Sequence, residues 1–373
     1  MKNKIAVIGS ICLCLFFASS LLAQEKGDTK NYLALSWGQV ALHMPDEWYG
    51  SPEALSVAET VMACQQDAGG WQKNKPYHKL TDVEKMAVSA HHADIGATID
   101  NGSTTTEMTF LAKVYSRHKD ERYWNAFKKG YDYLLEAQYK NGGWPQFYPA
   151  RGAGFVSYSS HITYNDNAMV NVMELLKGIA DNTSPYAQLP LTKEMKEHAG
   201  KAFNKGIACI LKTQIVVEGK PTVWCAQHDE VTLLPANARA YELASFSGAE
   251  SLGIIRLLMQ VQQPSREIVA AVNGAMAWLD AHKITGFSVT RVPDANGKKN
   301  TVIQKDDNAL PLLARFYDLQ TGKPFFCDRD GIKKSALTEI GDERRNGYSW
   351  YNAGLTPLQS EYYKWMQKWN SKA

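Results

Sequence analysis

The stretch G-G-W-Q-K-N at residues 69–74 returns as G-G-W-P-Q-F-Y-P at residues 142–149. Each copy follows a run with helical character, and glycines in such a position commonly end a helix. A unit of helices closed by a tryptophan-bearing loop therefore occurs more than once. Units of this kind bury their apolar faces only against neighbouring units, so the repeat indicates an array of helices whose loops gather on one face.

Apolar residues recur at helical spacing through most of the remaining chain. The spacing predicts helices over residues 106–117, 123–138, 166–176, 194–214, 247–259 and 268–281. Residues 307–326 are expected to form a fourth, shorter copy of the helical unit, because their D-N-A repeats the D-N-A of residues 166–168. Short strands are expected near residues 286–292 and 301–304, where Val, Thr and Ile concentrate.

Stacked helix pairs that curve into a closed ring leave no exposed ends and bring their loops to one mouth. The expected fold class is therefore all-α, an α/α toroid with a few short strands in its loops. An open solenoid is the alternative, and the periodicity leaves the number of helix pairs open. We expect one domain over residues 24–373.

The first 23 residues are predicted to be a signal peptide. Lys2 and Lys4 precede an apolar run over residues 5–22, and small residues lie just before a cleavage site ahead of Gln24. A retained membrane anchor is the alternative, but small and polar residues weaken the span. We expect an exported monomer, periplasmic or secreted, with no membrane contact after the leader is removed.

Composition and motifs exclude several classes of function. The formal net charge is +3, which is too small for a general nucleic-acid binder. Serine-hydrolase, zinc-protease and phosphate-loop motifs are absent from the sequence. The cysteines beyond the leader have no disulfide or zinc spacing and are expected to be free, buried thiols: Cys64, Cys209, Cys225 and Cys327.

Two loops pair an aspartate with an asparagine, in T-I-D-N-G at residues 98–102 and in Y-N-D-N-A at residues 164–168. Asp100-Asn101 and Asp166-Asn167 precede predicted helices, so each pair can be explained as a helix cap worth roughly 1 kcal/mol. Their equivalent places in successive units also allow them to point at one spot. Carboxylate and amide oxygens are hard ligands that suit Ca²⁺.

Four cations lie in or near polar loops: Lys73, Arg239, Arg315 and Arg329. Structural ion pairs are one interpretation, with Arg239–Glu242 and Arg329–Asp330 as candidates. A guanidinium binds a carboxylate through a fork of two hydrogen bonds, so several arginines at one mouth suit an acidic polymer.

Taken in order, eight motifs resemble the polysaccharide lyase family 10 pectate lyases. They are G-G-W-Q-K-N, T-I-D-N-G-S-T-T-T-E-M, N-G-G-W-P-Q-F-Y-P, Y-N-D-N-A-M-V, W-C-A-Q-H-D, P-A-N-A-R-A-Y-E-L-A-S-F-S-G-A-E-S, A-R-F-Y-D and F-C-D-R-D-G. The resemblance covers nearly the whole chain beyond the leader. It implies an (α/α)₃ toroid and Ca²⁺-dependent β-elimination of α-1,4-linked polygalacturonate (pectate), giving unsaturated oligogalacturonides.

The resemblance also implies a role for each residue singled out above. Arg239, in P-A-N-A-R-A-Y-E, corresponds to the family's catalytic base. Asp100 and Asp166 match the calcium region, with Asn101 as a further ligand. Lys73, Arg315 and Arg329 match cations that meet substrate carboxylates.

An arginine base poses a chemical difficulty, because free guanidinium is protonated well above neutral pH. We expect Ca²⁺ and neighbouring cations to disfavour the charge on Arg239, and an alkaline optimum to help. Two other functions remain open. A glycoside hydrolase on the same fold would recruit carboxylates such as Asp100, Asp166 and Asp229 as acid and base. An exported pectin-binding module would bind the polymer without cutting it.

Overall fold

The computed structural model describes residues 29–93, 96–151, 156–293, 297 and 299–369. The predicted signal peptide lies outside this part of the chain. Within it, no helix combines the length and the apolar character needed to span a bilayer.

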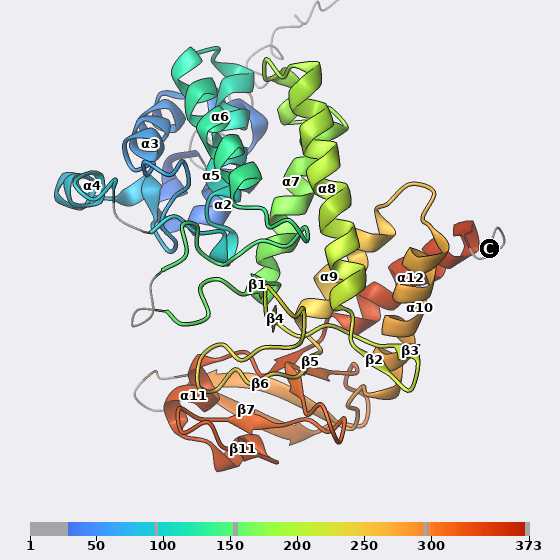
Figure 1. Ribbon diagram of the computed structural model, residues 1–373. Coiled ribbons are helices and arrows are strands. Elements are labelled where there is room, and N and C mark those ends of the chain that lie inside the picture. Colours follow the sequence, from blue (N-terminus) through green and yellow to red (C-terminus); the bar gives the residue numbers. More distant parts are fainter. Residues whose placement is uncertain (1–28, 94–95, 152–155, 294–296, 298, 370–373) are drawn as a thin grey trace, which may run out of the picture.

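Six helices form three pairs, and the two members of each pair are consecutive in the chain and pack against each other (Figure 1). The pairs are α5 (Thr105–Arg117) with α6 (Glu121–Glu136), α7 (Ala168–Ala180) with α8 (Lys193–Thr213), and α9 (Glu250–Met259) with α10 (Arg266–Ala281). These helices confirm the six that the apolar spacing predicts. They make up an α/α toroid with three helix pairs, the number that the family resemblance implies.

Further helices cover the two ends of the row of pairs. At the N-terminal end α2 (Trp37–His43) and α3 (Pro52–Ala63) pack on α5, and α4 (Asp82–Ser89) packs on α3. At the other end α12 (Leu355–Trp369) packs on α9 and α10. Short 3₁₀ segments lie in the connections: η1 (Thr29–Ala34), η2 (Asp46–Gly50), η3 (Tyr77–Lys79), η4 (Asp100–Gly102), η5 (Asn165–Asn167), η6 (Tyr186–Gln188) and η7 (Leu337–Glu339).

The repeated tryptophans explain why the loops recur. Each is fully buried, and its indole Nε1 donates a 2.7 Å hydrogen bond to a carbonyl in the last turns of the preceding helix: Trp71 to Val61, Trp144 to Leu134 and Trp224 to Ile210. A buried indole N–H without a partner would cost folding free energy. The tryptophan therefore fastens each loop back onto its own helix.

A glutamine just after each of these helices, which the sequence analysis did not single out, joins neighbouring pairs. Its amide Nε2 donates both to its own loop and to a helix of the next pair. The bonds run from Gln65 to Gly69 (2.7 Å) and Ala126 (2.9 Å), from Gln138 to Gly142 (3.0 Å) and Ala202 (2.9 Å), and from Gln214 to Thr222 (2.7 Å) and Ala271 (2.9 Å). We call these three residues the bridging glutamines.

The glycine pairs of the repeat have a steric reason. Gly69 has φ +103° and Gly142 has φ +97°, a region that side chains rarely adopt. A Cβ atom at Gly142 would also collide with the backbone carbonyl of Lys205 in α8. The glycines thus allow each loop to pass close to a neighbouring helix.

The strands are short and form two-stranded antiparallel ribbons. They are β1 (Ile162–Thr163) with β4 (Gln227–His228), β2 (Val216–Val217) with β3 (Lys220–Pro221), β5 (Phe246–Ser247) with β9 (Phe316–Tyr317), β6 (Phe287–Pro293) with β7 (Lys299–Lys305), β8 (Leu313–Ala314) with β12 (Tyr351–Asn352), and β10 (Phe326–Cys327) with β11 (Lys333–Lys334). The β6–β7 hairpin confirms the two predicted strands. Together with the short helix α11 (Asp342–Gly347), it lies at one end of the helices (Figure 1).

The prediction that residues 307–326 form a fourth helical unit is wrong. This segment instead contains β8 and β9, and β10 begins at Phe326. Pro311 lies near the start of the predicted helix. The aromatic residues of the segment pack with distant partners in a second apolar cluster. Tertiary pairing thus overrides a local similarity of sequence. The four described cysteines are free and buried, as predicted.

Candidate active site

The two acid–amide loops fold into the same kind of turn. The first forms η4 directly before α5, and the second forms η5 directly before α7. The two turns contact each other, so the polar residues of successive units lie side by side. The sequence analysis expected this convergence.

The structure shifts the expected match between the loops by one residue. Asn101 (φ 53°, ψ 32°) and Asp166 (φ 49°, ψ 35°) occupy the same left-handed position in the two turns. Asp100 therefore corresponds to Asn165, and not to Asp166 as the D-N pairs suggested. Both members of this inner pair are buried, whereas Asn101 and Asp166 are exposed.

Helix capping does not explain these residues. The N-cap of α5 is Thr104 and that of α7 is Asn167, and neither side chain accepts a capping hydrogen bond. Asp100 instead accepts a 3.1 Å bond from the backbone N–H of Asn101. A left-handed aspartate or asparagine that caps nothing stores backbone strain, which is common at functional sites.

Lys73 binds the buried carboxylate of Asp100. The ammonium group donates to Oδ2, and it also lies 5.6 Å from the centre of the Phe147 ring. About a third of the Lys73 side chain, 36%, stays exposed, while Asp100 shows only 4%. Beside them, Asn101 donates a 3.0 Å bond to the side chain of Asn74. A predicted substrate cation and a predicted metal ligand thus touch each other.

Arg315 joins the second turn to α9. Its Nη2 lies 2.9 Å from Asn165 Oδ1, 3.1 Å from Asp166 Oδ1 and 2.6 Å from Glu250 Oε1. Burial alone would lower the pKa of Arg315, but the charges of Glu250 and Asp166 outweigh it and raise the pKa. Arg315 is therefore a firmly charged group, and its side chain is only 8% exposed.

Arg239 is held in a fork by Glu242. Its Nε lies 2.8 Å from Oε2 and its Nη2 lies 2.6 Å from Oε1. The Arg239–Glu242 pair foreseen in the sequence is therefore present, and 43% of the arginine side chain is exposed. Burial would lower the pKa of Arg239, but hydrogen bonds and the charge of Glu242 raise it above its ordinary value. Glu242 thus favours the charged guanidinium, and the effect expected of Ca²⁺ and neighbouring cations on Arg239 stays a prediction.

Arg329 lies near Arg239, and we call the surface that carries these two arginines the rim. It forms a fork with Glu343, at 2.9 Å and 2.7 Å, and not with Asp330 as the sequence suggested. Glu343 raises the pKa of Arg329 through these bonds. The guanidinium lies 5.9 Å from the Tyr241 ring, which Arg239 approaches to 5.1 Å from its own position. Tyr241 thus connects the two arginines.

Tyr348 closes the chain of contacts between Arg239 and the acid–amide turns. Its hydroxyl donates a 2.7 Å hydrogen bond to Glu242 Oε1, and its ring lies 4.7 Å from the guanidinium of Arg315. Contacts therefore run from Lys73 through the two turns to Arg315, and then to Arg329. All seven residues singled out in the sequence belong to this continuous network: Lys73, Asp100, Asn101, Asp166, Arg239, Arg315 and Arg329.

Sequence reasoning missed several members of the network. Glu250, Asn165, Tyr348 and Arg344 were not singled out. Asn165 lies directly beside a chosen aspartate, and Glu250 lies in the S-G-A-E-S stretch quoted for the family resemblance. Tyr348 and Arg344 lie far along the chain and carry no motif that points to this site.

The donor atoms at the two turns suit a hard cation. Asp100, Asp166 and Asn101 offer only oxygen ligands, as Ca²⁺ and Mg²⁺ require, and two of the three are exposed. Three side chains leave further coordination positions for water and for substrate oxygens. Elsewhere in the described chain, His161, Asp229 and Glu230 bring ligand atoms within 4.8 Å of one another, and His161 and Glu230 already form a 3.0 Å pair. That cluster includes none of the predicted ligands.

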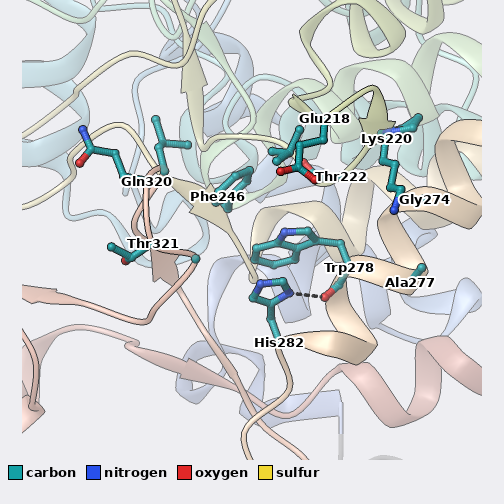
Figure 2. A pocket seen from close by; sticks show the side chains of 14 residues that line it. Glu218, Lys220, Thr222, Phe246, Gly274, Ala277, Trp278, His282, Gln320 and Thr321 are labelled. Carbon is teal, nitrogen blue, oxygen red and sulfur yellow. Dashed lines mark hydrogen bonds between the residues drawn. The ribbon is translucent and has the colours of Figure 1, made fainter.

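A pocket of about 540 Å³ lies away from these residues, against β2, β3 and α10 (Figure 2). Trp278 and His282 stack in it with ring centres 3.9 Å apart. None of the seven predicted site residues lines it. A largely apolar pocket suits a small molecule, whereas an anionic polymer needs a charged face such as the surface that carries the arginines.

The chain is similar to one protein family and to two solved structures. Residues 65–356 match the protein family described as pectic acid lyase. A mutant of a family 10 polysaccharide lyase from Cellvibrio cellulosa, solved in complex with trigalacturonic acid, is 34% identical, with a TM-score of 0.74 over 88% of this chain and 98% of that chain. Another structure of a family 10 polysaccharide lyase from the same organism is 33% identical, with a TM-score of 0.74 over 88% and 94% of the two chains. A search of curated proteins found no match.

Proposed function

Since this chain belongs to the pectic acid lyase family and is a polysaccharide lyase, we propose that it cleaves polygalacturonate by β-elimination, with Ca²⁺ as cofactor and Arg239 as base. The relative solved with trigalacturonic acid supports a galacturonate polymer as the substrate. The observation that carries the proposal is the continuous network of acid–amide turns, cations and Arg239 on one rim.

β-Elimination removes the proton on C5 of a uronate while the oxygen on C4 leaves. The negative charge of the carboxylate beside C5 must be neutralised before the C5 proton is acidic enough to be removed. Asp100, Asp166 and Asn101 hold Ca²⁺, which when bound supplies positive charge to the substrate carboxylate. Lys73, Arg315 and Arg329 bind carboxylates along the polymer, and Arg315 also fixes the position of Asp166.

Arg239 then takes the C5 proton. Its exposed guanidine faces the rim, and Glu242 stabilises the guanidinium that forms, as the carboxylate does in a Ser-His-Asp triad. Only the neutral guanidine can accept the proton, so the rate rises with pH. The electrons of the C5–H bond form the C4–C5 double bond, and the C4–O bond breaks toward the leaving sugar.

The test is absorbance in the near ultraviolet during incubation with polygalacturonate, with and without a calcium chelator. The unsaturated sugar end of an elimination product absorbs there. We expect absorbance to rise, to stop with the chelator and to return when Ca²⁺ is restored. Activity that ignores the chelator would remove the calcium role from Asp100, Asp166 and Asn101.

A glycoside hydrolase would give new reducing ends without this absorbance. The family match and the solved polysaccharide lyases favour elimination over hydrolysis. A binding module would give neither product.

The cellular setting is part of the same proposal. We propose that the leader is cut before Gln24 and that the protein acts as an exported monomer, periplasmic or secreted. Mass spectrometry of the mature N-terminus and light scattering of the purified protein test both statements. A protein that keeps residues 1–23, or that elutes as a dimer, contradicts them.

A further inference from the structure

We propose that Glu242, itself held by Tyr348, is a positioning residue that turns the Nη1 atom of Arg239, and no other atom of that side chain, toward the substrate. This inference rests on the proposed function and says which atom of the base reacts and why.

The fork leaves one nitrogen of the guanidinium available. Nε and Nη2 of Arg239 both point at the Glu242 carboxylate, at 2.8 Å and 2.6 Å. Two parallel bonds fix the plane of the group as well as its position, which a single bond would not do. Nη1 makes no hydrogen bond to the described residues, and the side chain is 43% exposed. Nη1 is therefore the nitrogen presented to a molecule on the rim.

Glu242 is fixed from both sides. Its carboxylate is only 7% exposed, and Oε2 also accepts a 3.3 Å bond from the backbone N–H of Arg239. The backbone N–H of Glu242 in turn donates a 2.7 Å bond to the carbonyl of Arg239. The two residues thus form one tight turn, and the fork is part of it.

Tyr348 connects this turn to the rest of the site. Its hydroxyl donates to Glu242 Oε1 at 2.7 Å, and its ring packs 4.7 Å from Arg315, 5.4 Å from the Tyr241 ring and 5.0 Å from the Trp350 ring. These contacts restrict rotation of the Tyr348 side chain. The position of Nη1 therefore depends on the same core that holds Arg315 against the acid–amide turns.

Orientation has an electrostatic cost. Glu242 stabilises the charged form of Arg239, which cannot accept a proton. The other titratable groups that face Arg239 are Tyr158, Tyr241 and Tyr348, with Arg329 and Arg344 grouped around the Tyr241 ring. The pKa of Arg239 is raised in spite of its burial, so Glu242 dominates. Glu242 therefore orients Arg239 for the reaction but lowers the fraction of Arg239 that is neutral.

The reacting atoms balance in this arrangement. Neutral Nη1 accepts the C5 proton, the C5–H electrons form the C4–C5 double bond, and the C4–O electrons leave with the oxygen, which takes a proton from solvent. Glu242 keeps its charge throughout and pairs with the new guanidinium.

The test is the pH dependence of kcat for Glu242→Gln. The amide keeps an acceptor for Arg239 but removes the charge, so the alkaline rise in kcat should move to lower pH by about one to two units. Because the pKa of Arg239 is high, kcat still rises with pH wherever the protein is folded, so the shift is measured as the difference between the pH values at which the two proteins reach the same kcat, with KM within about twofold. Loss of a merely structural contact would not move the pH at which kcat rises.

A matched control exists in the same molecule. Glu343 forms an equivalent fork with Arg329, and Glu343→Gln removes the same charge from the same rim. We expect its pH profile to keep the position seen in the unmodified protein. An equal shift in both variants would mean that general surface charge, and not the fork on Arg239, sets the profile, and would overturn the inference.

Tyr348→Phe gives a second readout, which decides the matter if Glu242→Gln does not fold. It removes one hydroxyl, and we expect kcat to fall by about tenfold with KM unchanged. Unchanged kcat in Tyr348→Phe, or an unmoved profile in Glu242→Gln, overturns the inference while leaving the lyase intact. Absence of unsaturated product from the unmodified protein overturns the proposed function itself.

Discussion

Single residues of this protein could be chosen from the sequence by their chemistry, but their partners could not. Arg239 stands out because small residues surround it in P-A-N-A-R-A-Y-E, and its nearby Glu242 is within reach along the chain. Arg315 binds Glu250 and Asp166, which lie 65 and 149 residues away. Only the fold brings such groups together. Local ion pairs are therefore predictable, whereas long-range ones are not.

Replacing Arg239 tests the base at this scale. Arg239→Lys keeps a positive charge but loses the fork, and Arg239→Ala loses both. We expect either change to lower kcat on polygalacturonate by about a hundredfold or more, since general bases contribute 10²–10⁴ in rate. Circular dichroism checks that the variant is folded. Near-normal turnover by either variant would exclude Arg239 as the base.

Glu107 should make stability depend on pH. It is 2% exposed, Trp37 Nε1 donates to it at 2.6 Å, and its other oxygen has no hydrogen-bond partner among the described residues. Burial raises the pKa of Glu107 to about 7. Between the ordinary pKa and this value the unfolded chain has lost the proton and the folded chain has kept it, so stability falls as pH rises through that window.

Glu107→Gln should remove this penalty. We expect the variant to gain on the order of 3 kcal/mol over the unmodified protein at about pH 8, and nothing at about pH 4. Urea unfolding at the two pH values measures the difference. A gain of the same size at both would show that Glu107 does not titrate in the folded state.

The positions of the helices were the part of the structure that the sequence predicted best. Each of the six paired helices could be found because its apolar residues recur locally. The segment at residues 307–326 misled, since its strands β8 and β9 pair with β12 and β5, which are distant in the chain. The register of the acid–amide turns was also misjudged. The motif D-N occurs twice, but the left-handed position falls on Asn101 in one copy and on Asp166 in the other.

The bridging glutamines give a prediction at the level of elements. Gln138→Ala removes two partly buried hydrogen bonds, one within its loop and one to α8. We expect a loss of roughly 2–4 kcal/mol in unfolding free energy, because two carbonyls lose their donors. Gln262→Ala, which replaces an exposed glutamine between α9 and α10, serves as the control and should change stability by less than about 0.5 kcal/mol. Equal effects of the two substitutions would contradict the bridging role.

The whole molecule separates a helical body from a charged rim. Three helix pairs supply the core, and the loops and short ribbons at their ends carry the cations and carboxylates. The fold class could be predicted because repeated units must stack. The rim could be predicted only in part, because Tyr348 and Arg344 reach it from a C-terminal segment with no repeat.

A rim of cations should make substrate binding sensitive to salt. We expect KM for polygalacturonate to rise several-fold between about 50 mM and about 500 mM NaCl, with kcat nearly constant, because salt screens exposed charges. Arg329→Gln should raise KM at low salt and flatten the dependence. A KM that does not respond to salt would mean that binding depends on other contacts.

Arg315 and Tyr348 both come from the final sixth of the chain, yet they touch Asp166 and Glu242, which emerge much earlier during synthesis. A partly made or C-terminally clipped polypeptide can thus stack its early helices while its chemistry stays incomplete. Lyase activity would then appear only after the strands and loops that carry Arg315 and Tyr348 have packed against the earlier part of the chain.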